Sequence, residues 1–314
     1  MHDLIIIGGG PSAMSAGIYA ARKKIKTLLI CKELGGQLNE AGQVENYLGF
    51  ESILGAELAQ KFVSHLKKFD LEIKEKQEIK KIERLADSGF KILNGHNDKE
   101  QSRAIIITSG KCSRKLGVPG EEKFIGRGIS FCAVCDAPLF KDKEVAVVGG
   151  GNAAVQSALE MAKYASKVYL LSLYSKLMAD KFEQEKIKAA SNIEVVFDVQ
   201  VKEIQGDRFV SGLIYQDTPN LSLGGGRKEK KKLSVQGVHI EIGSIPSSNF
   251  IKDVVELNEK GEIKIDYQNR TSQPGIFAAG DVTNVSHKQI VIAAGEGAKA
   301  ALNACEYLKD APQM

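Results

Sequence analysis

Short apolar runs that stop at glycine, each followed by a stretch of small residues, are the dominant pattern along the chain. The first run, Leu4–Ile7, ends at Gly8, and a second run, Thr27–Ile30, follows the small-residue stretch. An apolar run that ends at glycine is typical of a buried parallel strand, and small residues after it favour a helix packed close to a sheet. The start of the chain therefore predicts a strand, a turn, a helix and a second strand.

The glycines of this first turn have the spacing of a dinucleotide-binding motif. Gly8, Gly10 and Ala13 fit G-x-G-x-x-G/A. A turn of this kind lets the backbone approach a pyrophosphate held at the N-terminus of the following helix. A glycine turn before an ordinary helix is the alternative, but the complete order of strand, turn, helix and strand favours a nucleotide site.

The same pattern recurs in the middle of the chain. An expected strand at Glu144–Val148 is followed by Gly149, Gly151 and Ala154, and then by a helix and a strand that ends near Leu171. Two such motifs predict two nucleotide-binding domains and an α/β fold. The second glycine turn could bind a nucleotide or could serve only close packing of strand against helix.

A third segment, near the C-terminus, also combines a strand with a small-residue helix. The expected strand Ile276–Ala279 ends at Gly280 and Asp281, and the helix begins at about Gln289. An aspartate here can accept a hydrogen bond from a ribityl hydroxyl, and the helix start can face the polar edge of a flavin. A glycine and an aspartate after a strand also occur in ordinary turns.

Composition and charge narrow the class of protein. The 314 residues are enough for two domains, and 43% hydrophobic and 26% charged residues are ordinary for a soluble globular chain. A net charge of +4 does not indicate nucleic-acid binding. No apolar run approaches the ~20 residues that span a bilayer, and the first run lacks the basic residues of a signal peptide. We expect a cytoplasmic protein.

Taken together, these segments resemble the low-molecular-weight thioredoxin reductases, which are flavoprotein disulfide reductases. The resemblance covers essentially the whole chain. It implies two Rossmann-like domains of the three-layer β/β/α type, the second inserted in the first, in a homodimer. The FAD-binding domain would be residues 1–113 and 245–314, and the NAD(P)H-type domain would be 114–244. The matching stretches are GGQLNEAGQVENYLGF (35–50), IIITSG (105–110), ISFCAVCDAPLF (129–140), GSIP (243–246) and GIFAAGDV (275–282).

The resemblance assigns FAD-binding roles to several segments. It places the pyrophosphate at the first glycine turn, the ribityl chain at Asp281 and the isoalloxazine edge at Gln289. Lys288 stands where the family usually has arginine, which keeps a cation beside the flavin but loses the planar fork of the guanidinium. The expected FAD-binding residues are Gly8, Gly10, Ala13, Gly36, Gln37, Asn46, Gly280, Asp281, Lys288 and Gln289.

The stretch FCAVCDAP holds two of the five cysteines, Cys132 and Cys135, followed by Asp136. A zinc site would need further ligands, and neither a second CxxC nor a matching histidine pair is present. A structural disulfide is uncommon in the cytosol. By the resemblance, Cys135 faces the flavin, Cys132 attacks the disulfide of thioredoxin, and Asp136 protonates the leaving thiolate.

The chain departs from the resemblance after the second glycine turn. NADPH-dependent members carry three arginines there that clamp the 2′-phosphate, and Leu173, Tyr174 and Met178 occupy those positions. NADH binding would favour an acid at the strand end, which is Ser172, and the first acid downstream is Asp180. The donor is therefore expected to be ferredoxin, with NADH, NADPH or a deazaflavin as alternatives.

Other functions remain possible. The chain could be a thioredoxin reductase that uses NADPH or NADH through a divergent clamp. It could also be a flavin-binding protein whose dithiol does not turn over. A ferredoxin–nicotinamide oxidoreductase on the same scaffold would lack the CxxC pair. Residues 221–234, rich in glycine and lysine, predict the tip of a long hairpin.

Overall fold

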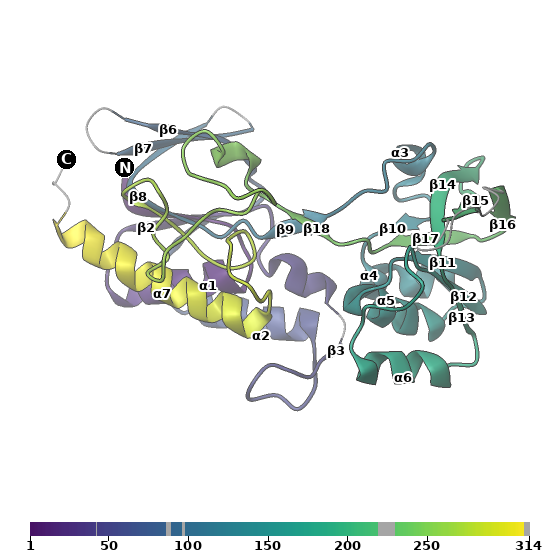
Figure 1. The fold of residues 1–314 in the computed structure, drawn as a ribbon. Coiled ribbons are helices and arrows are strands. Elements are labelled where there is room, and N and C mark those ends of the chain that lie inside the picture. Colours follow the sequence, from purple (N-terminus) through teal and green to yellow (C-terminus); the bar gives the residue numbers. More distant parts are fainter. Residues whose placement is uncertain (42, 86–88, 96–97, 219–229, 311–314) are drawn as a thin grey trace. The chain divides into compact units, whose positions relative to one another are not determined.

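The chain folds into two compact units (Figure 1). The computed structural model describes residues 1–41, 43–85, 89–95, 98–218 and 230–310. Residues 1–112 and 245–314 form the first unit, and residues 113–244 form the second. The chain leaves the first unit along β9 (Lys111–Ser113) and returns along β18 (Ser244–Pro246), and these two strands pair with each other.

The first unit is built on a seven-stranded sheet. The strand order is β5-β2-β1-β8-β7-β6, and β19 pairs with β8. The neighbours β5, β2, β1 and β8 pair in parallel, and so do β8 and β19. The neighbours β8, β7 and β6 pair antiparallel. The strands are β1 (His2–Ile7), β2 (Thr27–Ile30), β5 (Glu72–Lys74), β6 (Ile79–Arg84), β7 (Phe90–Asn94), β8 (Lys99–Ile107) and β19 (Ile276–Ala278).

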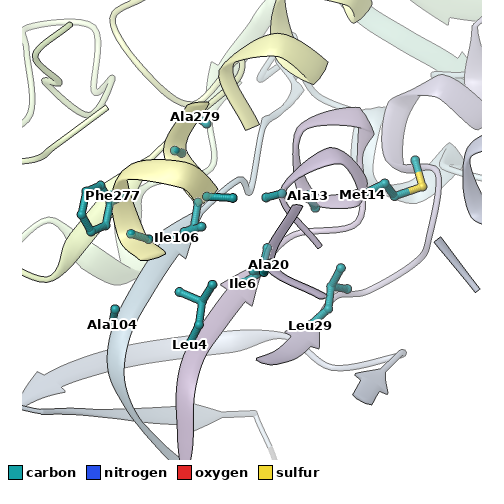
Figure 2. Close-up of a cluster of buried hydrophobic side chains, with 14 of the residues drawn as sticks. Leu4, Ile6, Ala13, Met14, Ala20, Leu29, Ala104, Ile106, Phe277 and Ala279 are labelled. Atoms are coloured by element: carbon teal, nitrogen blue, oxygen red, sulfur yellow. The ribbon is translucent and has the colours of Figure 1, made fainter. Parts of the chain in front are cut away.

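Both faces of this sheet are buried, which is why its central strands are continuously apolar. Leu4 and Ile6 lie in one apolar cluster with residues of α1 (Pro11–Arg22) and α7 (Ile290–Asp310) (Figure 2). The intervening Ile5 and Ile7 belong to a second cluster on the opposite face. The sheet is thus covered on both sides, as the apolar runs predict.

Small residues let α1 and α7 approach closely. A Cβ atom on Gly297 would lie 2.0 Å from the carbonyl oxygen of Ser12, so only glycine fits at this crossing. The remaining elements of the first unit are α2 (Gly55–Leu66), the 3₁₀ helices η1 (Gly36–Glu40) and η3 (Asn249–Ile251), and the paired strands β3 (Gln43–Val44) and β4 (Ile53–Leu54).

The second unit has a five-stranded parallel sheet in the order β10-β17-β11-β12-β13 and a separate antiparallel sheet in the order β14-β15-β16. The predicted α/β class with two Rossmann-like sheets is therefore confirmed. The elements are α3 (Glu121–Phe124), β10 (Ile129–Ser130), α4 (Ala133–Asp136), η2 (Ala137–Phe140), β11 (Glu144–Val148), α5 (Asn152–Ala162), β12 (Lys167–Leu171), α6 (Lys181–Ala189), β13 (Ile193–Val196), β14 (Val199–Gly206), β15 (Val210–Asp217), β16 (Lys230–Leu233) and β17 (Gly237–Ile240).

The hairpin predicted at residues 221–234 is flanked by β15 and β16, which pair in antiparallel register. Four of its residues, Lys230–Leu233, lie in β16, so the expectation of a loop through 234 is wrong for that part. Cross-strand pairing with β15 holds these residues in the sheet despite their charge. Residues 219–229 lie outside the described part of the chain.

Candidate active site

The two cysteines of the CxxC stretch form a disulfide in the second unit. The Sγ atoms of Cys132 and Cys135 are 2.05 Å apart. Cys132 is the residue before α4, and its Sγ accepts a hydrogen bond from the backbone N–H of Cys135 at 3.1 Å. Cys132 is half-buried and Cys135 is exposed. The pair can therefore be reached from outside this unit.

The groups around the disulfide bear on the alternative of a zinc site. Across the described ranges, no group of three or more His, Cys, Asp or Glu side chains is placed to hold a metal ion. The two sulfur atoms are bonded to each other rather than arranged around a third atom. A disulfide of this kind can act as a two-electron couple, which opens to a dithiol and closes again.

Asp136 ends α4, directly after Cys135. Its backbone N–H donates to the Cys132 carbonyl oxygen at 3.1 Å, and its side chain is half-buried. The structure thus places a carboxyl group one residue from the exposed sulfur. Its role as a proton donor remains a prediction.

Two of the other cysteines are unsuited to thiolate chemistry. Burial, together with the charges of Glu75 and Glu33, raises the pKa of the Cys31 thiol to about 12. Burial also raises the pKa of Cys305. Since the thiolate is the reactive form, both act as buried small side chains. Cys112 is exposed and lies in the first unit.

The first glycine turn has the shape of a pyrophosphate cradle. Gly8 has a φ of +135°, and a Cβ atom there would lie 2.2 Å from the Thr108 carbonyl oxygen, so no other residue fits. At Gly10, the residue before α1, an added Cβ would meet nothing within 4 Å. The open side of the turn is therefore the side where a ligand can approach the start of the helix.

Further observations fit a bound dinucleotide at this turn. Ser12 Oγ is buried and has no hydrogen-bond partner among the described residues, so a donor or acceptor from a ligand would satisfy it. A Cβ on Gly36 would lie 3.2 Å from Gly10 Cα, so η1 begins against the turn. Ala13 is fully buried in the apolar cluster beside it. These residues fit the expected FAD.

Gly280 and Asp281 lie close to the same helix start. A Cβ on Gly280 would lie 3.1 Å from Ser12 Cβ, which brings the segment after β19 next to α1. Burial raises the pKa of Asp281, while Lys288 and Lys111 act against that shift. A partly buried carboxylate with a raised pKa gains from a hydroxyl donor, which is what a ribityl chain would provide.

The structure joins two predicted flavin-site residues that are far apart in sequence. The side-chain amide of Asn46 donates to Gln289 Oε1 at 3.2 Å. Both side chains are exposed, as is that of Gln37. Gln289 lies immediately before α7, so the start of that helix faces the 45–50 segment. Their contact with FAD remains a prediction.

Lys288, expected as a cation beside the flavin, has partners of its own in the protein. Its Nζ lies 3.2 Å from Glu262 Oε1 and also donates to the Thr283 carbonyl oxygen. Lys111 Nζ lies 3.2 Å from the same Glu262 oxygen. One buried carboxylate thus holds two lysines, and Lys288 brings less net charge to this region than a free cation would.

This cluster gives a testable pH dependence. Burial alone would raise the pKa of Glu262, but hydrogen bonds from Asn258, Lys111 and Lys288 outweigh it and hold the pKa at about 2. The stabilisation is fully present above 4.5, the ordinary value, and is lost as the pH falls through about 2. We expect Glu262→Gln to lower the free energy of unfolding at pH 7 by roughly 3 kcal/mol.

Urea denaturation at several pH values measures the difference in the free energy of unfolding between the parent and Glu262→Gln. This difference should shrink as the pH falls below 4.5. Glu256→Gln is the matched control. The Glu256 side chain is exposed and lies 3.5 Å from Lys264 Nζ, so its loss should cost less than about 0.5 kcal/mol. An equal effect of the two substitutions would contradict the account of the cluster.

The second glycine turn keeps its geometry. Gly149 has a φ of +151°, and a Cβ atom there would lie 2.1 Å from the Glu241 carbonyl oxygen. At Gly151, the residue before α5, an added Cβ would meet nothing within 4 Å. Ala154 is fully buried against the sheet. The turn therefore still has an open side at the start of a helix.

The segment after β12 lacks the arginines that the resemblance places around the 2′-phosphate of NADPH. Ser172 is fully buried, and its hydroxyl donates to the Tyr174 carbonyl oxygen at 3.0 Å and accepts from the Tyr174 N–H at 3.2 Å. The hydroxyl is thus used within its own turn. Leu173, Tyr174 and Met178 are exposed apolar side chains where the resemblance requires arginines.

Asp180, the first acid downstream, is held beside the start of α5. Its Oδ2 accepts from the side-chain amide of Asn152 at 2.9 Å, and its backbone N–H donates to Asn152 Oδ1 at 2.7 Å. Asn152 is the first residue of the helix that follows the glycine turn. A carboxylate here opposes the binding of a pyrophosphate at the same helix end. Sequence reasoning considered Asp180 only as a ribose ligand.

A buried histidine near the disulfide was missed from the sequence. His239, on β17, is 1% exposed and is linked through Ser130 to the backbone of Cys132. No motif marks it, because its partners lie 82 and 109 residues away in the sequence. The parallel pairing of β10 with β17 brings Ser130 opposite His239, and the second partner, Ser157, lies on α5.

Comparisons with known proteins find relatives along nearly the whole chain. The sequence pattern of the pyridine nucleotide-disulphide oxidoreductases matches residues 2–297. An alkyl hydroperoxide reductase component from Staphylococcus aureus (strain MRSA252) is 39% identical over 307 residues, which are 98% of this chain. The chain spans 59% of the length of that relative.

Solved structures of thioredoxin reductases resemble the whole chain. That of Lactococcus lactis thioredoxin reductase in its FR conformation has a TM-score of 0.91 and 35% identity, and covers 99% of this chain and 100% of its own. A ferredoxin-flavin thioredoxin reductase from Clostridium acetobutylicum has a TM-score of 0.53 and 31% identity, with 98% of both chains covered. None of the described helices combines the length and hydropathy that a membrane crossing needs.

Proposed function

This chain belongs to the pyridine nucleotide-disulphide oxidoreductase family, and on that premise we propose that it is an FAD-dependent thioredoxin reductase whose electrons come from ferredoxin. The observation that carries the reductase role is the Cys132–Cys135 disulfide, with Cys135 exposed and its N–H on the Cys132 sulfur. An oxidoreductase of this family needs a redox pair of this kind to pass electrons to a protein disulfide.

The first unit would hold the FAD. The N–H groups at the start of α1, with Ser12, would bind the pyrophosphate, and Asp281 would accept from the ribityl chain. Asn46 and Gln289, already hydrogen-bonded to each other, would lie at the polar edge of the ring. When bound, FAD supplies the two-electron chemistry that connects the donor to the disulfide.

The cysteines would then carry the electrons to the partner. Two electrons and two protons convert the Cys132–Cys135 disulfide to a dithiol. The Cys132 thiolate attacks one sulfur of the thioredoxin disulfide, which forms a mixed disulfide and releases the other thioredoxin sulfur as a thiolate. Asp136 would give that thiolate a proton. The Cys135 thiolate attacks Cys132 Sγ, releases reduced thioredoxin and restores the original disulfide.

Ferredoxin as donor is supported by the nucleotide segment of the second unit. The positions of the three clamp arginines are apolar, Ser172 is buried and used locally, and Asp180 places a negative charge by the start of α5. NADPH would lose the arginine clamp on its 2′-phosphate here, and NADH would lack an acid at the strand end. The relative from Clostridium acetobutylicum is a ferredoxin-flavin thioredoxin reductase, which supports the same donor class.

Trapping a mixed disulfide tests the proposal. Without the second sulfur, Cys135→Ser cannot resolve the intermediate, so we expect it to accumulate as a covalent one-to-one adduct with oxidised thioredoxin. Mass spectrometry of the adduct should place the bond at Cys132. The doubly substituted Cys132→Ser, Cys135→Ser protein is the control. An adduct through Cys112, or none at all, would contradict the assigned roles.

A further inference from the structure

A fully buried imidazole connects two elements of the second unit. His239 Nδ1 lies 3.1 Å from Ser130 Oγ, and Nε2 lies 3.1 Å from Ser157 Oγ. Ser130 belongs to β10 and Ser157 to α5, and both hydroxyl groups are buried. Glu241 Oε2 is 3.7 Å from Nε2, which is too long for a hydrogen bond.

Ser130 passes this contact on to the first cysteine of the pair. Its Oγ accepts from the Cys132 N–H at 3.3 Å and lies 3.3 Å from the Cys132 carbonyl oxygen. Ser130 and His239 stand opposite each other in the parallel register of β10 and β17. The strand pairing therefore fixes the distance between the imidazole and the hydroxyl.

The Ser130 hydroxyl can donate only one hydrogen bond, so the tautomer of His239 decides where its proton goes. The hydroxyl oxygen already accepts a hydrogen bond from the Cys132 N–H. If His239 Nδ1 carries a proton, it donates to Ser130 Oγ, and the hydroxyl proton goes to the Cys132 carbonyl oxygen. In that arrangement, Ser130 makes three hydrogen bonds, two of them to Cys132. The other neutral tautomer would draw the hydroxyl proton to Nδ1 and leave the carbonyl oxygen without it.

We propose that His239 is a positioning residue of the redox pair, acting through Ser130 on the backbone of Cys132. With that backbone held on both sides, Cys132 Sγ stays where it accepts the Cys135 N–H. If the hydrogen bond from the Cys135 N–H to Cys132 Sγ persists after the disulfide is reduced, it stabilises the Cys132 thiolate, because a hydrogen-bond donor to the charged form favours that form. This deepens the proposed function, in which Cys132 is the attacking sulfur.

Two substitutions of His239 separate its two contacts. Asparagine can place a polar atom near the position of Nδ1 and keep the contact to Ser130. Glutamine can place one near Nε2 and keep only the contact to Ser157. Ser130→Ala removes the link itself, and Ser157→Ala removes only the far contact. The nearby carboxylates, Glu241 and Asp136, are unchanged in all four variants.

The readout is the rate at which iodoacetamide labels Cys132 in the reduced, FAD-loaded protein, followed by mass spectrometry with exposed Cys112 as internal reference. At pH 7 we expect His239→Gln and Ser130→Ala to label roughly fivefold more slowly than the parent, the effect of one hydrogen bond. His239→Asn and Ser157→Ala should stay within about twofold of the parent. At pH 10, above the ordinary pKa of a thiol, all rates should converge.

Parent-like labelling of His239→Gln or of Ser130→Ala at pH 7 would overturn the proposal. The proposal would also be overturned if these variants were labelled more slowly by the same factor at pH 7 and at pH 10, because that indicates changed access to Cys132 and not a changed thiolate. A labelling rate in Ser157→Ala that falls as far as in Ser130→Ala would overturn it as well. If His239→Gln does not fold, Ser130→Ala decides alone. Labelling needs neither thioredoxin nor a donor, so this inference and the reductase role can fail separately.

Discussion

Cys132→Ser is expected to lose thioredoxin reduction by a factor on the order of a thousand or more, while its FAD stays bound. A serine hydroxyl cannot form the mixed disulfide, and in the proposed roles the remaining sulfur, Cys135, receives electrons from the flavin and does not attack thioredoxin. Of the described cysteines outside the pair, Cys31 and Cys305 are buried and Cys112 lies in the other unit. Chemistry at the partner should therefore stop.

FAD retention follows from the division of the chain. Every residue that fits FAD lies in the first unit, and Cys132 lies in the second. The flavin absorbance per chain and the thioredoxin thiols formed per minute, measured on the same sample, give both quantities. Cys112→Ser is the control and should keep the parent rate. Thioredoxin reduction by Cys132→Ser at the parent rate would show that another group attacks the disulfide.

Reduced ferredoxin is expected to bleach the bound flavin faster than NADPH by roughly a thousandfold at equal concentration, and faster than NADH as well. For NADPH, the loss of two charge-assisted hydrogen bonds to the 2′-phosphate, at about 1.5–3 kcal/mol each, accounts for a difference of this size. Anaerobic stopped-flow absorbance with each donor in turn measures it. Bleaching by NADPH as fast as by ferredoxin would mean that another set of residues binds the nucleotide.

A gain-of-function variant checks the physical cause. Arginines at Leu173, Tyr174 and Met178 restore cations, and Asp180→Asn removes the carboxylate beside the start of α5. The combined variant should bleach faster with NADPH than the parent. A variant with the three arginines but with Asp180 unchanged should show a smaller increase in the rate of flavin bleaching by NADPH, because the Asp180 carboxylate still opposes binding of the pyrophosphate. Equal gains would assign no role to Asp180.

The sequence alone predicts those features that depend on neighbours in the chain. Strands, glycine turns and their helices follow from the spacing around Gly8 and Gly149, because turn geometry and close packing restrict residue type locally. The redox pair follows from the spacing of Cys132 and Cys135, which the resemblance interprets. The parallel strands β1, β2 and β8 of the first sheet and the parallel sheet of the second unit follow from the repeated strand and helix pattern, and the structure confirms them.

Features that depend on distant side chains could not be predicted in this way. The pairing of Lys288 with Glu262, and the link from His239 to Ser130, join residues that only the tertiary fold brings together. The bond of Asp180 to Asn152 depends on how the segment after β12 returns to the start of α5. Each contact changes the charge or the hydrogen bonding expected from residue type alone.

Anaerobic mixing of the photoreduced flavoprotein with oxidised thioredoxin tests the central claim most directly, because it needs no natural donor. The account predicts that the flavin absorbance returns and that four thioredoxin thiols appear for each flavin reoxidised, two from the flavin electrons and two from the Cys132–Cys135 dithiol that photoreduction also forms. With Cys132→Ser, the flavin should stay reduced. A wild-type flavin that remains bleached in the presence of thioredoxin, but recovers when oxygen is admitted, would contradict the account.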